Sequence, residues 1–326
     1  MSMIDDTMTN PQLHVIFGAG QVGRPLAEHL LAAGHRVRIV KRAPMRAPAG
    51  AEVVTGDASD GAFCTAAARG AAVVYHCINP PYAADIWAEQ VPRLLEALLA
   101  AAGRAGARLV VLDNVYALGR PAGRLLDEER PLNPCSRKGE VRARAIARLL
   151  DAHRRGDVRA TAGWASDFYG PGGTLTHLGD EFWPGVMAGK RGRLVVRPDA
   201  VHTYHYIPDV AAGLMALGTA GGDVEGRPWM LPCAPAGTLR QLVDRFAAHL
   251  ARPIRLSTLP PFGLRAVGLF VPMLRELAEM SYQWEEPFVV DDRRFRERFP
   301  IRPTDPDEAA RATVAWATAH YRGGGD

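Results

Sequence analysis

The feature that most constrains this chain is an apolar run that ends in three spaced glycines and leads into a helical pattern. Residues 13–17 (LHVIF) are followed by residues 18–23 (GAGQVG), and apolar residues then recur at helical spacing up to Gly34. This order predicts a strand, a glycine-rich turn and a helix. Glycines so spaced permit a tight turn, close approach of a ligand to the backbone, and close packing of helix on strand.

The same alternation continues through the first half of the chain. Further apolar runs lie at residues 37–40, 51–54, 71–75, 108–112 and 158–162. Helical patterns separate most of them, the longest at residues 85–102 and 137–155. Strands alternating with helices predict an α/β fold with a doubly wound parallel sheet of the Rossmann type.

The regular alternation ends near Gly170, and we expect a smaller, discontinuous C-terminal substrate lobe beyond it. The predicted Rossmann domain comprises residues 11–170 plus about 205–235, and the substrate lobe comprises residues 171–204 plus 236–326. The return to the first domain is expected to consist of a helix capped by Asp209 and a strand at residues 227–232.

Composition excludes several classes of protein. The chain has 326 residues, 48% of them hydrophobic, and a net charge of +4 that is not gathered in a run, so we expect no nucleic-acid partner. No apolar stretch is long enough to span a membrane, and the four cysteines are widely spaced. A cytoplasmic protein with reduced thiols and no membrane contact is predicted. His202 and His205 lack a third ligand at suitable spacing, so no metal site is expected.

The glycine motif, placed between a strand and a helix, predicts a dinucleotide whose phosphates meet the helix N-terminus. An NAD-selective site usually has an acidic residue at the end of the second strand, but this chain has Lys41 and Arg42 there, with Arg24 after the third glycine. These cations favour NADP(H), and a solvated basic turn is the alternative. Asp57, after the third strand, is placed either to accept from the adenine amino group or to cap the next helix.

Several further motifs resemble those of the extended or atypical short-chain dehydrogenase/reductase superfamily, in its NAD-dependent epimerase/dehydratase branch. They are GAGQVG, GDASD, VVYHCINPPY, LVVLDNVYALG, PLNPCSRKGEVRA, WASDFYGPGG and HYIPDVAAGL. With the glycine motif, the resemblance implies that the following residues bind the cofactor: Gly18, Gly20, Gln21, Val22, Gly23, Arg24, Lys41, Arg42, Asp57, Ala58, Cys77, Ile78, Asn79, Lys138, Ala165 and Ser166.

The resemblance also implies a catalytic Ser/Thr, Tyr and Lys, and here the chain departs from the pattern. Lys138 takes the Lys position, where it would bind the nicotinamide ribose, and Asn114 takes the Ser/Thr position. Pro134 stands where the tyrosine belongs and has no proton to give. Tyr116 is our leading substitute, because strand alternation would point it to the same face as Asn114; the alternative is an ordinary packed aromatic residue.

Other side chains are candidates for the substrate site. Tyr82 and Tyr169 lie in loops that the resemblance places near the reactive end of the cofactor, and His177 either faces the substrate or lies on the surface.

We therefore expect an NADP(H)-dependent oxidoreductase that reduces a carbonyl, or epimerises through a transient oxidation, on a small organic metabolite. The missing tyrosine keeps two alternatives open: a non-redox lyase or isomerase that retains the nucleotide, and an NADP(H)-binding redox sensor without turnover. The resemblance suggests a homodimer formed through the helices at residues 85–102 and 137–155.

Overall fold

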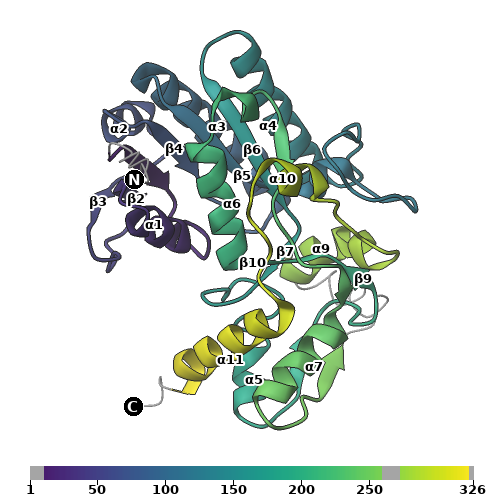
Figure 1. The fold of residues 1–326 in the computed structure, drawn as a ribbon. Helices are drawn as coiled ribbons and strands as arrows, with labels where there is room; N and C mark the ends of the chain where they lie inside the picture. Colours follow the sequence, from purple (N-terminus) through teal and green to yellow (C-terminus); the bar gives the residue numbers. More distant parts are fainter. Residues whose placement is uncertain (1–10, 259–271, 323–326) are drawn as a thin grey trace, which may run out of the picture.

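The central element is a sheet of seven parallel strands in the order β11-β6-β5-β4-β1-β2-β3. The computed structural model describes residues 11–258 and 272–322 (Figure 1). The strands of the sheet are β1 (Leu13–Phe17), β2 (Arg36–Lys41), β3 (Ala51–Thr55), β4 (Val73–His76), β5 (Arg108–Asn114), β6 (Arg159–Ala165) and β11 (Pro228–Met230). The order reverses between β1 and β4, and the predicted doubly wound fold is confirmed.

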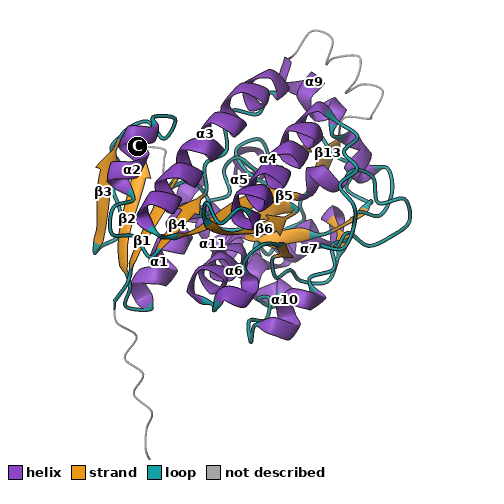
Figure 2. Ribbon diagram, turned by 90° about the horizontal axis from the view of Figure 1, so that it is seen from above, coloured by secondary structure: helices purple, strands orange, loops and turns teal. Residues whose placement is uncertain are grey.

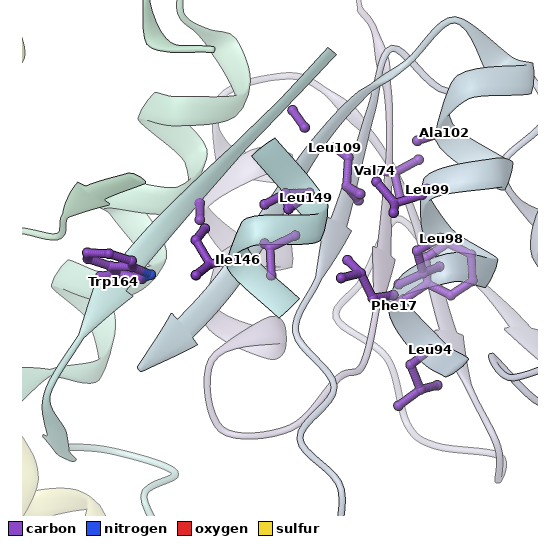
Figure 3. Packing of buried hydrophobic residues seen from close by; sticks show 14 of the residues in the cluster. Phe17, Val74, Leu94, Leu98, Leu99, Ala102, Leu109, Ile146, Leu149 and Trp164 are labelled. Atoms are coloured by element: carbon purple, nitrogen blue, oxygen red, sulfur yellow. The ribbon is translucent and has the colours of Figure 1, made fainter. Parts of the chain in front are cut away.

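Helices cover both faces of this sheet, as the alternating pattern requires (Figure 2). One face carries α2 (Gly61–Ala67), α3 (Ala84–Ala105) and α4 (Arg137–Arg154). The other carries α1 (Gly23–Ala32), α6 (Ile207–Thr219) and the short α10 (Arg293–Arg298). Figure 3 shows the first interface, where Phe17, Leu98 and Leu149 are among the buried residues between strands and helices.

A second hydrophobic core lies in the C-terminal lobe. It is built mainly from α5 (Trp183–Met187), α7 (Leu239–His249) and α11 (Pro306–Arg322), which lie together at the bottom of Figure 1. Short strands complete the lobe and its junction: β7 (Asp167–Tyr169), β8 (Gly192–Leu194), β9 (Val201–His202), β10 (Tyr204–Tyr206), β12 (Gly237–Thr238) and β13 (Leu256–Thr258). The remaining elements are α9 (Pro272–Glu279) and the 3-10 helices η1 (Val115–Leu118), η2 (Gly222–Val224) and η3 (Ser281–Trp284).

Asp209 does not cap α6, the helix that precedes the last strand of the main sheet. β11 pairs with β6 in the main sheet, whereas α6 begins at Ile207, so Asp209 lies inside the first turn. Its carboxylate accepts hydrogen bonds from the backbone N–H and the hydroxyl of Thr304, at 2.9 and 2.6 Å. Asp209 therefore ties α6 to the C-terminal part of the chain. In the described ranges, no helix combines the length and apolarity needed to cross a membrane.

A buried arginine fixes the end of α6 against the sheet. Arg108, the first residue of β5, forms an ion pair with Glu225 at 2.8 Å, and both side chains are buried. Its guanidinium also donates to the carbonyls of Leu217, Gly218, Ala220 and Gly221. The carbonyls at a helix C-terminus have no partners within the helix, so Arg108 satisfies groups that would otherwise be buried without hydrogen bonds.

His14, His76 and His205 are three of the buried histidines. Burial lowers the pKa of His14 and of His76 to about 3 and that of His205 to about 4. His14 lies in β1, with Nδ1 3.1 Å from the Tyr75 hydroxyl. All three are therefore neutral in the native protein at neutral pH.

The first prediction concerns Arg108. Replacing it with Met leaves four buried carbonyls without this donor and the Glu225 carboxylate with only the longer contact to Arg159, at 3.9 Å, so the free energy of unfolding should fall by about 3–5 kcal/mol. Urea unfolding measures this. Arg154→Met is the control, because Arg154 pairs with Asp151 on the surface and exposed pairs contribute about 0–1 kcal/mol. Equal losses in the two variants would contradict the role of Arg108.

The second prediction concerns pH. The unfolded chain protonates a histidine below about 6.5, whereas the buried histidines stay neutral until about pH 3–4. The contribution of these three histidines to stability should therefore be constant above about pH 6.5 and fall below it, by about 1.4 kcal/mol per pH unit for each of them. His14→Gln should reduce this slope by one such increment in urea unfolding between about pH 6 and pH 4. The exposed His320→Gln control should leave the slope unchanged, and an unchanged slope in His14→Gln would refute the assignment.

Candidate active site

The glycine-rich turn lies where the sheet order reverses, and the backbone is crowded on both sides of it. Gly18 has a φ of +99°, and a Cβ there would stand 2.8 Å from the carbonyl of Cys77. A Cβ on Gly23 would stand 1.9 Å from the Gly18 oxygen. Gly20 differs, because a Cβ on it would meet no atom within 4 Å. The turn is therefore compact at its base and open at Gly20, as a site for a diphosphate requires.

The N-terminus of α1 faces this opening without a capping side chain. Val22, buried, occupies the cap position and makes no side-chain hydrogen bond to the first turn. The Gln21 side-chain oxygen is buried and has no hydrogen-bond partner. Uncapped backbone N–H groups and the positive end of the helix dipole suit a phosphate group, so these residues fit a dinucleotide.

The predicted cations lie at the next strand end. Lys41 ends β2, Arg42 follows it in an exposed position, and Arg24 forms an exposed ion pair with Glu28 at 3.2 Å. These positions do not test whether the site prefers NADP(H) to NAD(H), so that preference stays a prediction.

Asp57 does not cap α2, so the helix-capping alternative for this residue was wrong. Asp60 is the cap, accepting from the backbone N–H groups of Ala62 and Phe63. Asp57 is exposed, and its carboxylate accepts from the Ser59 N–H at 2.9 Å, which lowers the pKa of Asp57. The adjacent Ala58 is buried. The adenine contact of Asp57 and the cofactor contact of Ala58 stay predictions.

The residues after β4 line the opposite side of the turn. Cys77 donates its N–H to the Phe17 carbonyl at 2.8 Å, and Ile78 donates to Nδ1 of His76 at 3.3 Å. The Asn79 side-chain oxygen accepts from Arg142 at 2.7 Å. Arg142 in turn lies 3.2 Å from buried Asp113, whose pKa burial raises. The chain after β4 is thus fixed by α4 and β5.

Tyr116 lies next to the end of β5 and not in the strand itself, where it had been predicted. β5 ends at Asn114, whose side-chain oxygen accepts from the Tyr116 N–H at 3.0 Å and starts η1. Tyr116 therefore lies in a 3-10 helix, and the argument from strand alternation was wrong, because the chain turns before Tyr116. Asn114 itself stands at the carboxyl end of the strand, as expected.

Tyr116 and Tyr82 form a hydroxyl pair. Their oxygens are 3.3 Å apart, and the Tyr116 ring stacks on Trp87 with ring centroids 6.2 Å apart. Burial raises the pKa of Tyr116, and the negative charge of Asp167 raises it further. Burial and the neighbouring Tyr116 likewise raise the pKa of Tyr82. Both phenols therefore carry their protons at neutral pH and suit the donation of a proton.

Lys138 lies in the first turn of α4, which begins after the capping residue Ser136. Its side chain is fully buried, and its ammonium lies 2.6 Å from a carboxylate oxygen of Glu276 and 2.6 Å from one of Glu279. Although burial opposes it, the bonds and charge of Lys138 lower the pKa of Glu276. The ammonium is thus neutralised by α9, and the predicted contact with a ribose stays a prediction.

The end of β6 carries a buried polar cluster. Ala165 is fully buried, and Ser166 donates its N–H to His205 and lies 3.0 Å from Nε2 of His202. Both histidines therefore contact Ser166. No group of three His, Cys, Asp or Glu side chains suited to a metal ion occurs in residues 11–258 and 272–322.

Asp167 and His177 extend this cluster toward the tyrosines. Asp167 lies 2.9 Å from Nε2 of His202 and 3.8 Å from Nε2 of His177. Burial alone would raise the pKa of Asp167, but its contact with His202 and the charge of His177 bring it below the usual value. Burial lowers the pKa of His177. His177 is half-buried, its ring edge on Trp284, so it lies in the cluster and not on the open surface.

Tyr169 is the one substrate candidate that the structure does not bring to this cluster. Its side chain is buried in the core of the second lobe, with its ring centroid 5.4 Å from that of Tyr206 and 6.5 Å from that of Phe246. These contacts place the ring to stabilise the lobe.

Sequence reasoning missed the groups that surround the tyrosines. Asp167 stood within the motif WASDFYGPGG and carried a signal, as a lone carboxylate directly after a strand. No sequence signal marked Trp87 or Arg142, because the contact between them depends on how α3 packs against α4.

Comparisons with known proteins agree with this architecture. Residues 18–156 match the NAD(P)H-binding family. No curated protein matches the sequence. Among solved structures, the chain is similar to the Bordetella bronchiseptica enzyme WbmG in complex with NAD, with 18% identity, a TM-score of 0.74 and 97% of each chain covered.

Two further structures are similar over almost the whole chain. UDP-glucuronic acid 4-epimerase from Bacillus cereus, in complex with NAD, has 13% identity and a TM-score of 0.76, covering 95% of this chain and 99% of that one. DesIV, a dTDP-glucose 4,6-dehydratase from Streptomyces venezuelae, has 18% identity and a TM-score of 0.77, covering 96% and 98%. The chain therefore shares the fold of these NAD-containing structures over almost its whole length, and its residues 18–156 match the NAD(P)H-binding family.

Proposed function

We propose that this protein is an NADP(H)-dependent oxidoreductase that acts on a carbonyl group of a small organic metabolite. The observation that carries the proposal is the protonated Tyr116 phenol beside Asn114, at the same edge of the sheet as the open glycine turn. In parallel α/β sheets, ligands bind outside the carboxyl ends of the strands at the point where the order reverses. The similar structures contain NAD, which supports a nicotinamide cofactor at this edge.

Each residue would contribute to binding or to proton transfer. The turn at residues 18–23 would hold the diphosphate, while Lys41 and Arg42 would bind the extra phosphate of NADP(H). A reduced nicotinamide, when bound, supplies the hydride for the carbonyl carbon. Asn114 would orient the carbonyl oxygen, and Tyr116 would give that oxygen its proton, so that an alcohol forms. Lys138, whose ammonium is paired with Glu276 and Glu279, would not itself transfer this proton.

Because burial raises its pKa, the Tyr116 phenol holds its proton at neutral pH, as a proton donor must, although the same shift makes it a weaker acid. Redox epimerisation uses the same groups in both directions, and an epimerase is among the similar structures. The two are separated by the fate of the cofactor: reduction consumes NADPH, whereas epimerisation by transient oxidation would reduce NADP⁺ and then restore it, with no net change. The lyase, isomerase and sensor alternatives are not favoured, since the site offers a proton donor suited to hydride chemistry.

Two expectations about the whole protein stay predictions. They are a homodimer formed through α3 and α4, and a cytoplasmic location. The division into the two predicted lobes is likewise a proposal.

The third prediction tests the cofactor. Lys41→Ala and Arg42→Ala should each weaken NADPH binding by about tenfold, because each removes a charge-assisted hydrogen bond to the extra phosphate. Binding of NADH should not change. Titration followed by nicotinamide fluorescence measures both. Arg36→Ala, at the amino end of the same strand, is the control and should have no effect. Tighter binding of NADH than of NADPH to the unaltered protein would contradict the NADP(H) assignment.

The fourth prediction tests the proton donor. Carbonyl compounds are first screened for NADPH oxidation, and the absence of oxidation or epimerisation with every compound would count against the proposed reaction. With an active compound, Tyr116→Phe should lower kcat by about 10²–10⁴-fold and leave the Kd of NADPH unchanged. Tyr169→Phe removes a buried phenol from the second lobe and should keep full activity. Undiminished turnover in Tyr116→Phe would remove Tyr116 from the mechanism.

A further inference from the structure

We propose that Lys138 is a positioning residue in this protein. In this proposal its buried ammonium docks α9 onto the first turns of α3 and α4 and seats Tyr82 against Tyr116, and it does not bind the ribose of the cofactor. The link to Tyr116 rests on the proposed function; the docking of α9 does not.

The ammonium of Lys138 has its hydrogen-bonding capacity filled by α9. Its nitrogen lies 2.6 Å from Glu276 Oε2, 2.6 Å from Glu279 Oε2 and 3.2 Å from the Glu276 carbonyl. An ammonium has three hydrogens and therefore three donors. All three have acceptors here, and the side chain is 0% exposed. A ribose hydroxyl would have to displace one of these acceptors.

The same two carboxylates satisfy the starts of two helices. Glu276 Oε2 accepts from the Ala84 N–H, the first of α3, at 2.9 Å, and that helix has no side-chain cap of its own. Glu279 Oε1 accepts from the Arg137 N–H, the first of α4. Carboxylates are stabilised at helix N-termini, where N–H groups are free and the dipole is positive. α9 thus supplies caps to α3 and α4 from a distant part of the sequence.

The choice of lysine at this place is informative. The chain has 39 Lys and Arg residues, and only Lys41, Lys138 and Lys190 are lysines. A compact ammonium fits between two closely spaced carboxylates, whereas the planar guanidinium of arginine needs more room. Arg137, which also contacts Glu276 and Glu279, is half-exposed, so the buried counterion is Lys138.

The docked ammonium also contacts the tyrosine pair. It lies 4.9 Å from the centroid of the Tyr82 ring, within the range of a cation–π interaction. The Tyr82 hydroxyl is 3.3 Å from that of Tyr116, and its ring packs edge-on against Trp87. Lys138 therefore acts on Tyr116 through Tyr82, and losing its charge should shift the Tyr82 ring.

The fifth prediction uses three variants: Lys138→Met, the doubly substituted E276Q/E279Q, and the triple variant that combines them. Lys190→Met, a surface lysine, is the matched control. We expect the Kd of NADPH to stay within about twofold in all of them, whereas a lost ribose contact would raise it by about tenfold. Hydrogen exchange at the first turns of α3 and α4 should rise in the first two variants and not in the control.

Turnover gives the readout that a purely structural role would not move. With a carbonyl compound that the unaltered protein reduces, Lys138→Met and E276Q/E279Q should each lower kcat by about a hundredfold at similar KM, because misplacing a reacting group by about 1 Å has that effect. The triple variant should be no slower than either, since residues that act as one unit are not additive. It should also be more stable than Lys138→Met, which leaves two carboxylates without their counterion.

Specific outcomes would overturn the proposal. One is weaker NADPH binding in Lys138→Met but not in E276Q/E279Q, which would make Lys138 a ribose ligand. Another is unchanged exchange at the helix starts, which would refute the docking of α9. If the losses of kcat add up in the triple variant, Lys138, Glu276 and Glu279 do not act as one unit. If the unaltered protein binds no nicotinamide nucleotide, the proposed function fails, while the exchange experiment still decides the docking. Should Lys138→Met not fold, the isosteric E276Q/E279Q variant keeps that experiment available.

Discussion

The close approach of two backbone segments, at the end of β1 and the end of β4, determines where this protein can bind a ligand. Gly18 leaves no room for a Cβ against Cys77, and Gly23 leaves none against Gly18. Because these contacts are between backbone atoms, no side-chain adjustment could relieve a substitution. They hold the start of α1 at the edge where β1, β4, β5 and β6 all end, so the glycine turn, Cys77, Asn114 and Ser166 lie along one line of strand termini.

Elsewhere in the described residues, buried charges occur in compensated sets that join elements distant in sequence. Arg108 and Glu225 join β5 to the end of α6, and Arg142 and Asp113 join α4 to β5. An isolated buried charge is strongly unfavourable, whereas a paired and hydrogen-bonded one is tolerated and fixes a geometry. The Lys138 set follows the same rule, with the difference that its partners come from α9. The geometry beside the tyrosines therefore depends on the C-terminal part of the chain.

Features of this protein that depend on residues close together in the sequence could be predicted, and features that depend on distant residues could not. Strands and helices of the main sheet could be predicted, because their apolar spacing is a local property and the glycine motif fixes the first crossover. The position of Tyr116 could not be predicted, because its N–H donates to the Asn114 side chain and the chain leaves the strand there. The prediction that Asp209 caps a helix was wrong for a similar reason, because its hydrogen-bond partner Thr304 is 95 residues away in the sequence. The burial of Tyr169 depends on α7, which no local pattern links to it.

The partners of Lys138 illustrate why a shared motif need not carry a shared role. Glu276 lies 138 residues from Lys138, so the sequence around residues 134–141 gives no sign that the ammonium is already neutralised. An ammonium lowers the pKa of a phenol when its charge is uncompensated and close to the phenolic oxygen. Here two carboxylates offset that charge, it lies over the ring of Tyr82, and the pKa of Tyr116 is raised. The absence of a tyrosine at Pro134 and the paired state of Lys138 are therefore consistent with each other, because a lysine with no tyrosine four residues before it to activate is available to dock α9.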